Sequence, residues 1–247
     1  MLKNRRKNPI IVAEMIEVYQ KGRLWWVLLV TGLLFIGSTF SGFFDPTEET
    51  RNTYNYIELF AETPTPDTIQ TWINMFLGLF GILSILVLEY AFSADKTIRA
   101  IISPIHLFLC VLACIGFLLL SLTSIRTLEL MPDLSHHYFA GDGQRRHAAA
   151  IAAELIPYDR NGWFLYAGNG CWCMYLTVEN LIEGRTSRLL GITGLLLALA
   201  LLLLLVFMEM DIGTYTSILS VAITVILAPS WFIGMAVHLR RLRSGNS

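Results

Sequence analysis

Charged residues are scarce in this chain of 247 residues. They make up 15% of it, against about 25% in an average soluble domain, while 55% of the residues are hydrophobic and the mean hydropathy is +0.58. The 18 Lys and Arg are balanced by 19 Asp and Glu, so the chain lacks the basic excess that attracts nucleic acid. These deficits exclude a soluble domain and nucleic-acid binding, and they indicate an integral membrane protein embedded in the lipid bilayer.

Catalytic sequence motifs are also missing. The chain has no HExxH, GxSxG or GxxxxGK[ST] pattern, the marks of zinc peptidases, serine hydrolases and phosphate-binding loops. The four cysteines, Cys110, Cys114, Cys171 and Cys173, do not have the spacing of metal ligands. We interpret them as small packing residues. An enzyme is therefore less expected than a non-enzymatic membrane protein, and no cofactor is predicted.

Long apolar runs are the main feature that the sequence does contain. A helix needs about 20 apolar residues to cross a hydrocarbon core of about 30 Å, and five runs meet this condition plainly. A sixth run, 162–182, has the length but carries Asn169 and Glu179. We expect an all-α polytopic bundle of six transmembrane helices. The expected spans are 24–44, 71–92, 101–125, 162–182, 189–208 and 214–238.

The distribution of basic residues favours six spans over five. With six spans and a cytoplasmic N-terminus, 13 of the 18 Lys and Arg lie on the cytoplasmic side. If 162–182 did not span, 8 would lie inside and 10 outside, against the positive-inside rule. We therefore expect a multi-pass protein of the cell membrane with both termini in the cytoplasm. The polar fourth span is expected in the centre of the bundle, because polar atoms in lipid must face protein.

The expected spans divide the chain into three parts. Residues 1–23 combine a basic flank with an apolar face and predict an amphipathic helix on the cytoplasmic membrane surface, although packing beneath the bundle is an equal alternative. Residues 24–239 form the membrane domain, and residues 240–247 form a basic cytoplasmic tail. Within the outer loop, the alanine-rich run 144–156 predicts a short helix on the outer face.

Three ionisable residues fall at a similar depth inside the expected spans. Glu89 and Glu179 lie near the inner ends of the second and fourth spans, and His106 lies inside the third, all about 5 to 8 Å from the cytoplasmic boundary at 1.5 Å per residue. Ionisable groups in a bilayer are costly, and each is a functional candidate. Two carboxylates and an imidazole in one pocket suit binding of a proton or a cation. The alternative is that each side chain reaches the interface separately.

Histidines suggest two further sites. His106 and His238 are the histidines of the expected spans, and imidazoles on opposed helices hold haem in helical bundles. His238 also lies beside basic residues at the membrane edge, where lipid headgroups or helix-end carbonyls explain it equally. In the outer loop, His136, His137 and His147 lie among acidic residues and define a candidate zinc site. Their spacing matches no zinc motif, and a solvated polar loop accounts for them as well.

The last 70 or so residues contain a short basic turn, a glycine-containing fifth span, and a last span with Pro and Trp before a basic tail. The residues of this pattern are Gly184, Arg185, Arg188, Gly191, Pro229, Trp231 and Gly234. By this pattern the C-terminal half resembles a broad prokaryotic family of six-helix membrane proteins known only as a domain of unknown function. The resemblance implies six helices and no particular activity.

Three classes of function remain open. The sequence favours an accessory or structural subunit, or a small membrane regulator, whose partners are other membrane subunits or further copies of itself. The second class is a small-solute or proton-coupled carrier that uses Glu89, His106 and Glu179. The third is a haem-binding membrane redox subunit.

Overall fold

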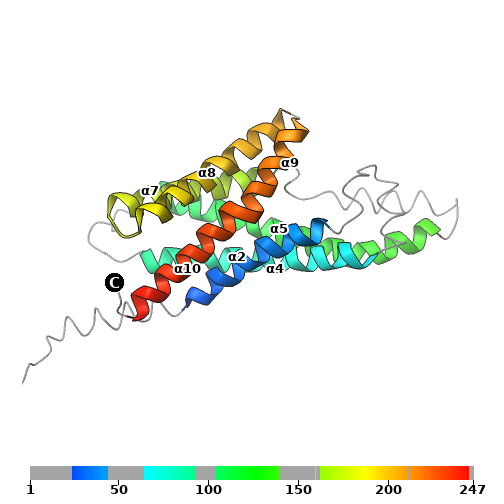
Figure 1. Ribbon diagram of the computed structural model, residues 1–247. Helices are drawn as coiled ribbons and strands as arrows, with labels where there is room; N and C mark the ends of the chain where they lie inside the picture. The colour runs from blue at the N-terminus through cyan, green and yellow to red at the C-terminus, as the bar shows by residue number, and fades with distance from the viewer. Residues whose placement is uncertain are drawn as a thin grey trace, which may run out of the picture.

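The computed structural model describes residues 24–43, 64–92, 104–139, 159, 162–210 and 212–244. Every regular element in these ranges is helical, as Figure 1 shows, so the predicted all-α class is confirmed there. In chain order the elements are α2 (Trp25–Phe43), α4 (Pro64–Phe92), α5 (Pro104–Phe139), η4 (Trp163–Gly168), α7 (Asn169–Ile182), α8 (Arg188–Glu209), α9 (Gly213–Val221), η5 (Ala222–Leu227) and α10 (Ala228–Ser244). The two η elements are π-helical turns: η4 leads directly into α7, and η5 joins α9 to α10.

Four helical stretches of the described chain are long and apolar enough to cross a membrane. They are Thr68–Phe92, Pro104–Leu130, Arg188–Glu209 and Gly213–Leu242. Helix α2 is apolar but shorter, and η4 with α7 forms a more polar helical stretch over nearly the range 162–182 expected from the sequence. The long apolar helices indicate a membrane protein that crosses the bilayer more than once.

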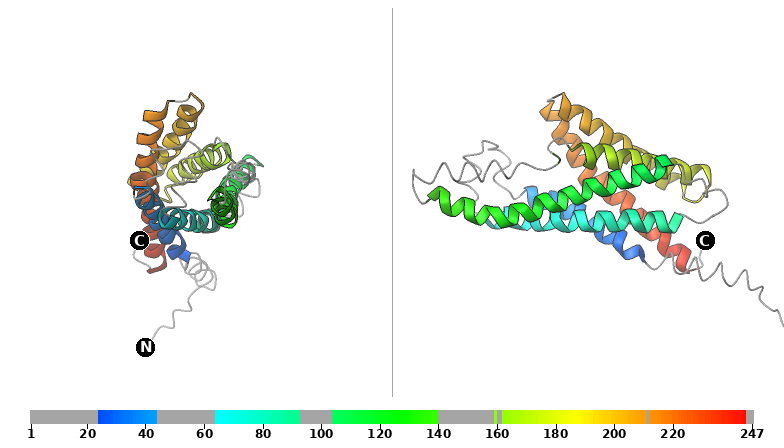
Figure 2. Two further views of the ribbon diagram at one scale, coloured as in Figure 1. Left: turned by 90° about the vertical axis from the view of Figure 1, so that its right-hand side faces the viewer. Right: turned by 180° about the vertical axis from the view of Figure 1, so that it is seen from behind.

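The helices close into a ring. Helix α4 packs between α2 and α5, α5 packs against η4 and α7, α7 packs against α8, and α10 contacts both α8 and α2. The end-on view in Figure 2 shows the same order around the bundle axis. Many large apolar side chains on the outside of the ring are exposed, among them Leu107, Phe108 and Ile192. Such a surface is suited to contact with lipid rather than water.

The polar fourth helix is a member of this ring rather than its centre, which corrects the sequence expectation. Its polar residues Asn169, Thr177 and Asn180 are buried, whereas Val178 and Ile182 are exposed. A helix in lipid needs only its polar face covered by protein, and a position in a closed ring provides this cover. The neighbouring helices therefore cover the polar residues of this helix.

Hydroxyl groups connect neighbouring helices of the ring. The hydroxyl oxygens of Thr31 on α2 and Ser84 on α4 lie 2.7 Å apart, and Thr31 also donates to the carbonyl oxygen of Phe80 at 3.1 Å. Ser121 on α5 donates to the carbonyl oxygen of Met75 on α4 at 2.8 Å. Hydrogen bonds of this kind stabilise helix pairs in membranes because lipid offers no competing partners.

Glycines on α5 and η4 allow the two backbones to touch. A Cβ atom added to Gly116 would lie 2.5 Å from the carbonyl oxygen of Phe164 and 2.7 Å from the Cα of Leu165. A Cβ atom added to Gly168 would lie 2.9 Å from the carbonyl oxygen of Leu112. Both clashes are with backbone atoms, which cannot move aside as a flexible side chain can. The contact between α5 and η4 therefore requires glycine on both sides.

Helix α5 is longer than the sequence predicts. The third span was expected to end at residue 125 and an outer loop to begin at 126, but the helix continues through Pro132 to Phe139. Its 36 residues measure about 54 Å, well beyond a hydrocarbon core of about 30 Å. Hydropathy marks where the apolar run ends, whereas the following Leu, Glu and Met residues are good helix formers that continue the helix beyond it.

Three further predictions from the sequence concern the two ends of the chain and the outer loop. Helix α10 continues to Ser244, so the first part of the expected basic tail, 240–244, prolongs the last helix. The amphipathic helix expected in 1–23 and the outer-loop helix expected in 144–156 lie outside the described residues.

Replacement of Gly116 by alanine is expected to destabilise the bundle. The new methyl group would press on the backbone of η4, and overpacking of this kind costs about 1–3 kcal/mol. The measurement is thermal unfolding of the purified protein in detergent. Gly213→Ala serves as the control, because a Cβ at Gly213 meets nothing within 4 Å. Equal melting temperatures for the two variants would contradict the close backbone contact.

Candidate functional site

Glu89, His106 and Glu179 lie together in the structure. The Nε2 atom of His106 lies 2.7 Å from Oε1 of Glu89, and its Nδ1 atom lies 4.0 Å from Oε2 of Glu179. The His106 side chain is 6% exposed, and those of the two glutamates are 21% and 20% exposed. We call these three residues the acid–histidine cluster.

Helix ends bring the three residues to one place. Glu89 lies in the last turn of α4, His106 in the first turn of α5 and Glu179 in the last turn of α7. Helices α4 and α5 pack along each other, and so do α5 and α7. Because successive helices run in opposite directions, the end of α4 and the end of α7 both meet the start of α5. The depth calculation from the sequence predicts this convergence.

Trp172 is a fourth member of the site that sequence reasoning missed. Its indole N–H donates to Oε1 of Glu89 at 2.8 Å, the same oxygen that meets His106. Trp172 is 2% exposed and lies on α7, seven residues before Glu179. Residues seven apart lie on one face of a helix. The spacing of Trp172 and Glu179 could therefore have assigned both residues to the same site.

The short contact between Glu89 and His106 requires a proton. Two electronegative atoms 2.7 Å apart form a hydrogen bond only if one of them carries hydrogen. Either the imidazole donates to a carboxylate, or a carboxylic acid donates to the imidazole. Both forms hold one proton between α4 and α5. Glu179 places a second carboxylate oxygen 4.0 Å from Nδ1, the other nitrogen of the imidazole.

The α7–α8 turn is connected to the end of α4 by Arg185. The Arg185 guanidinium donates to the carbonyl oxygen of Phe92, the last residue of α4, and forms a 2.8 Å ion pair with Glu183. Carbonyl groups at helix C-termini have no partner within the helix, and a guanidinium is a suitable donor for them. The contact holds the ends of α4 and α7 together, and these are the ends that carry Glu89 and Glu179.

The two histidines of the expected haem site, His106 and His238, have different surroundings in the structure. Both ring nitrogens of His106 face carboxylates of the acid–histidine cluster. The ring of His238 stacks on Phe92 with centroids 6.3 Å apart. The haem site between these two histidines stays a prediction.

The candidate zinc site falls mostly outside the described residues. His136 lies on the extension of α5 and is exposed, whereas the His137 side chain and all of His147 are not described. Within the described ranges no group of three or more His, Cys, Asp or Glu side chains could hold a metal ion. The zinc site stays a prediction.

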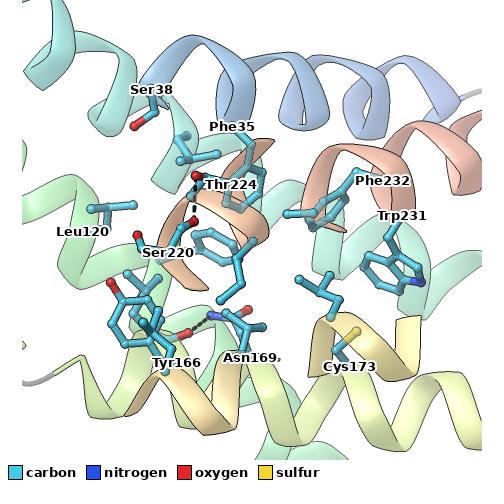
Figure 3. Close-up of a pocket in the computed structure, with 18 of the residues that line it drawn as sticks. Phe35, Ser38, Leu120, Tyr166, Asn169, Cys173, Ser220, Thr224, Trp231 and Phe232 are labelled. Atoms are coloured by element: carbon cyan, nitrogen blue, oxygen red, sulfur yellow. Dashed lines mark hydrogen bonds between the residues drawn. The ribbon is translucent and has the colours of Figure 1, made fainter. Parts of the chain in front are cut away.

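A cavity of about 250 Å³ lies inside the ring, and Figure 3 shows side chains that line it. None of its lining side chains carries a charge. Polar side chains from six elements line it, namely Ser38, Asn74, Tyr166, Asn169, Ser220 and Thr224. Aromatic side chains line it as well, namely Phe35, Phe117, Tyr166, Trp172, Trp231 and Phe232.

The sequence analysis did not predict this cavity. Trp172 belongs to both sites, since it lines the cavity and donates to Glu89.

No family model, no curated protein and no solved structure matches this chain. The resemblance of the C-terminal half to a six-helix family therefore stays a prediction, and the function must be argued from the two sites.

Coupling between Glu89 and His106 is expected in a double-mutant cycle. Removal of His106 alone leaves a carboxylate in apolar surroundings without its main partner, so His106→Ala should cost more than it does in a Glu89→Gln background. We expect a coupling energy of about 0.5–3 kcal/mol, measured from thermal unfolding in detergent.

The control cycle combines His106→Ala with Ser217→Ala, because Ser217 is exposed on α9 and bonds only within its own helix. This pair should be additive. Additivity of the Glu89 and His106 changes as well would refute a shared proton between the two side chains.

Proposed function

We propose that this chain is a six-span protein of the cell membrane that binds and releases a proton at the acid–histidine cluster and acts as a proton-coupled carrier of a small solute. The observation that supports the proposal most strongly is the 2.7 Å contact between Glu89 and His106, which requires a proton in an apolar bundle. Proton relays in membrane transporters use the same side-chain types.

The environment of the cluster suits proton exchange from one side. Each glutamate side chain is about one-fifth exposed, so water can reach the carboxylates, whereas His106 is almost fully covered. On the opposite side, Trp172 covers Glu89 and packs edge-on against Trp231, with ring centroids 6.1 Å apart. Protons therefore have access to the carboxylates, while Trp172 lies between Glu89 and the cavity that it lines.

The six-span topology is part of the proposal. Together η4 and α7 run for 20 residues, or about 30 Å, which is enough to cross the hydrocarbon core. The polar face of this stretch is covered by protein, which removes the main objection to a span of such composition. With both termini in the cytoplasm, the acid–histidine cluster lies near the cytoplasmic surface.

The sequence alone favours an accessory subunit or a regulator over a carrier. A subunit needs neither an imidazole–carboxyl contact that holds a proton nor an internal cavity, and this chain has both. These two features are the reason for preferring the carrier.

Reporter fusions test the topology. A fusion after Arg185 is expected to report the cytoplasm, because this turn carries two of the basic residues that the positive-inside rule keeps inside. A fusion after Met210, at the end of α8, is expected to report the opposite side and serves as the matched comparison. If both fusions report the same side, or if their sides are exchanged, the proposed topology fails.

Infrared spectroscopy tests proton binding directly. Difference spectra of the purified protein at two pH values should contain carboxylic acid and imidazole bands from the acid–histidine cluster. Glu89→Gln and Glu179→Gln should each remove or shift these bands, because each removes one of the two carboxylates around His106.

Glu209→Gln is the matched control, because Glu209 also accepts a bond from a tryptophan, Trp163 at 3.1 Å, but in an exposed place. It should leave the cluster bands unchanged. Unaltered bands in both cluster variants would refute proton binding at this site.

A further inference from the structure

We propose that the cavity inside the ring is a binding site for a small uncharged amphiphile, a single ring that bears one hydrogen-bond donor such as a hydroxyl group. The role of the cavity as the solute site of a carrier rests on the proposed function. Its role as a binding site rests on its geometry alone.

The volume of the cavity sets the size of the ligand. A cavity of about 150 Å³ takes benzene. The present cavity of about 250 Å³ is larger by two-thirds, so it fits a molecule of about ten non-hydrogen atoms. This corresponds to one ring with a short polar substituent.

The lining of the cavity sets the chemistry of the ligand. Figure 3 shows Ser38, Ser220, Thr224 and Tyr166 towards one end, and Trp231, Phe232 and Cys173 towards the other. Aromatic walls suit a ring, and the polar end suits its substituent. A charged ligand is excluded because no lining side chain carries a compensating charge.

The hydrogen bonds at the polar end favour a donor on the ligand. Ser38 donates its hydroxyl hydrogen to Oδ1 of Asn74 at 2.6 Å, and Thr224 donates its own to the carbonyl oxygen of Ser220 at 2.8 Å. Each hydroxyl has one hydrogen but two lone pairs, so both oxygens can still accept. A ligand hydroxyl or N–H group would complete this arrangement.

Two π-helical turns provide an independent reason to regard the cavity as a site. Leu165 and Tyr166 belong to η4, and Ile223 and Thr224 belong to η5, and all four line the cavity. Single π-helical turns within α-helices are rare and occur frequently at functional sites. Here two such turns, on helices far apart in the sequence, border the same space.

Trp172 links the cavity to the acid–histidine cluster. Its ring lines the cavity, and its N–H donates to Glu89. A ligand that shifts this ring must also change the hydrogen bonding of Glu89, and hence the affinity of the cluster for a proton. Binding in the cavity and protonation of the cluster are coupled through this one side chain.

Binding of para-bromobenzyl alcohol to the full-length protein in detergent tests the proposal. The probe has the required size, one ring and one hydroxyl group, and its bromine quenches the fluorescence of Trp172 and Trp231 at the cavity wall. We expect saturable quenching in the wild type. The charged analogue para-bromobenzoate should give no saturable quenching. Quenching by the alcohol that rises linearly without saturation would indicate partition into detergent and overturn the proposal.

Two variants locate the binding. Ala228→Phe should abolish saturable quenching, since Ala228 lines the cavity and is buried there. Thr224→Val should weaken binding about three- to tenfold, the worth of one hydrogen bond. Thr216→Val is its matched control, because Thr216 also donates to the carbonyl oxygen four residues earlier, that of Ile212, but does not line the cavity. If Ala228→Phe does not fold, the Thr224 and Thr216 pair decides, and equal affinities for those two variants overturn the proposal.

The Glu89→Gln variant separates this proposal from the proposed function. It should still bind the probe saturably, with a changed Kd, because Glu89 does not line the cavity but accepts the hydrogen bond of Trp172, which does. Saturable binding together with unchanged infrared bands in the glutamate variants would leave the cavity site standing and remove the proton carrier. Loss of the infrared bands in the glutamate variants, without saturable binding by the wild type, would remove the cavity site and leave the proton carrier standing.

Discussion

Polar atoms within a bilayer must find their partners inside the protein, and this constraint organises the whole ring. Helix α7 carries Asn169, Thr177 and Glu179 in a stretch that must lie in lipid if the proposed topology holds. Its polar face can be satisfied only if neighbouring helices close around it. The acid–histidine cluster is the clearest case, because Glu89 accepts a hydrogen bond from Trp172 of α7 and is hydrogen-bonded to His106 of α5.

Most of the helical framework could be predicted from the sequence, for a physical reason. Hydropathy measures the free-energy cost of moving a side chain from lipid into water. The observed helix 188–209 accordingly differs by only one residue at each end from the expected span 189–208. The convergence of Glu89, His106 and Glu179 also follows from simple geometry, since helix rise converts sequence position into depth. Where the apolar run and the helix have different ends, as at Phe139 of α5, hydropathy gives the wrong boundary.

The cavity could not be predicted because it depends on how backbones pack rather than on any local pattern. The close contact at Gly116 brings η4 against α5, and no periodicity marks this glycine as different from others. The η5 turn ends two residues before Pro229, which lacks the N–H that would bond to Val225. The sequence places the proline, but only the packed structure shows that the adjacent turn widens and that Thr224 faces the cavity.

The function proposed for the two sites depends on their order along η4 and α7. Tyr166 and Asn169 line the cavity, Trp172 touches both sites, and Glu179 belongs to the acid–histidine cluster. By linkage, any ligand that alters the proton affinity of the cluster must itself bind with an affinity that depends on protonation. A carrier needs this reciprocity, because a proton gradient can drive a solute only if the two affinities depend on each other. In the proposed carrier a single indole, packed between Glu89 and Trp231, provides that dependence without direct contact between solute and proton.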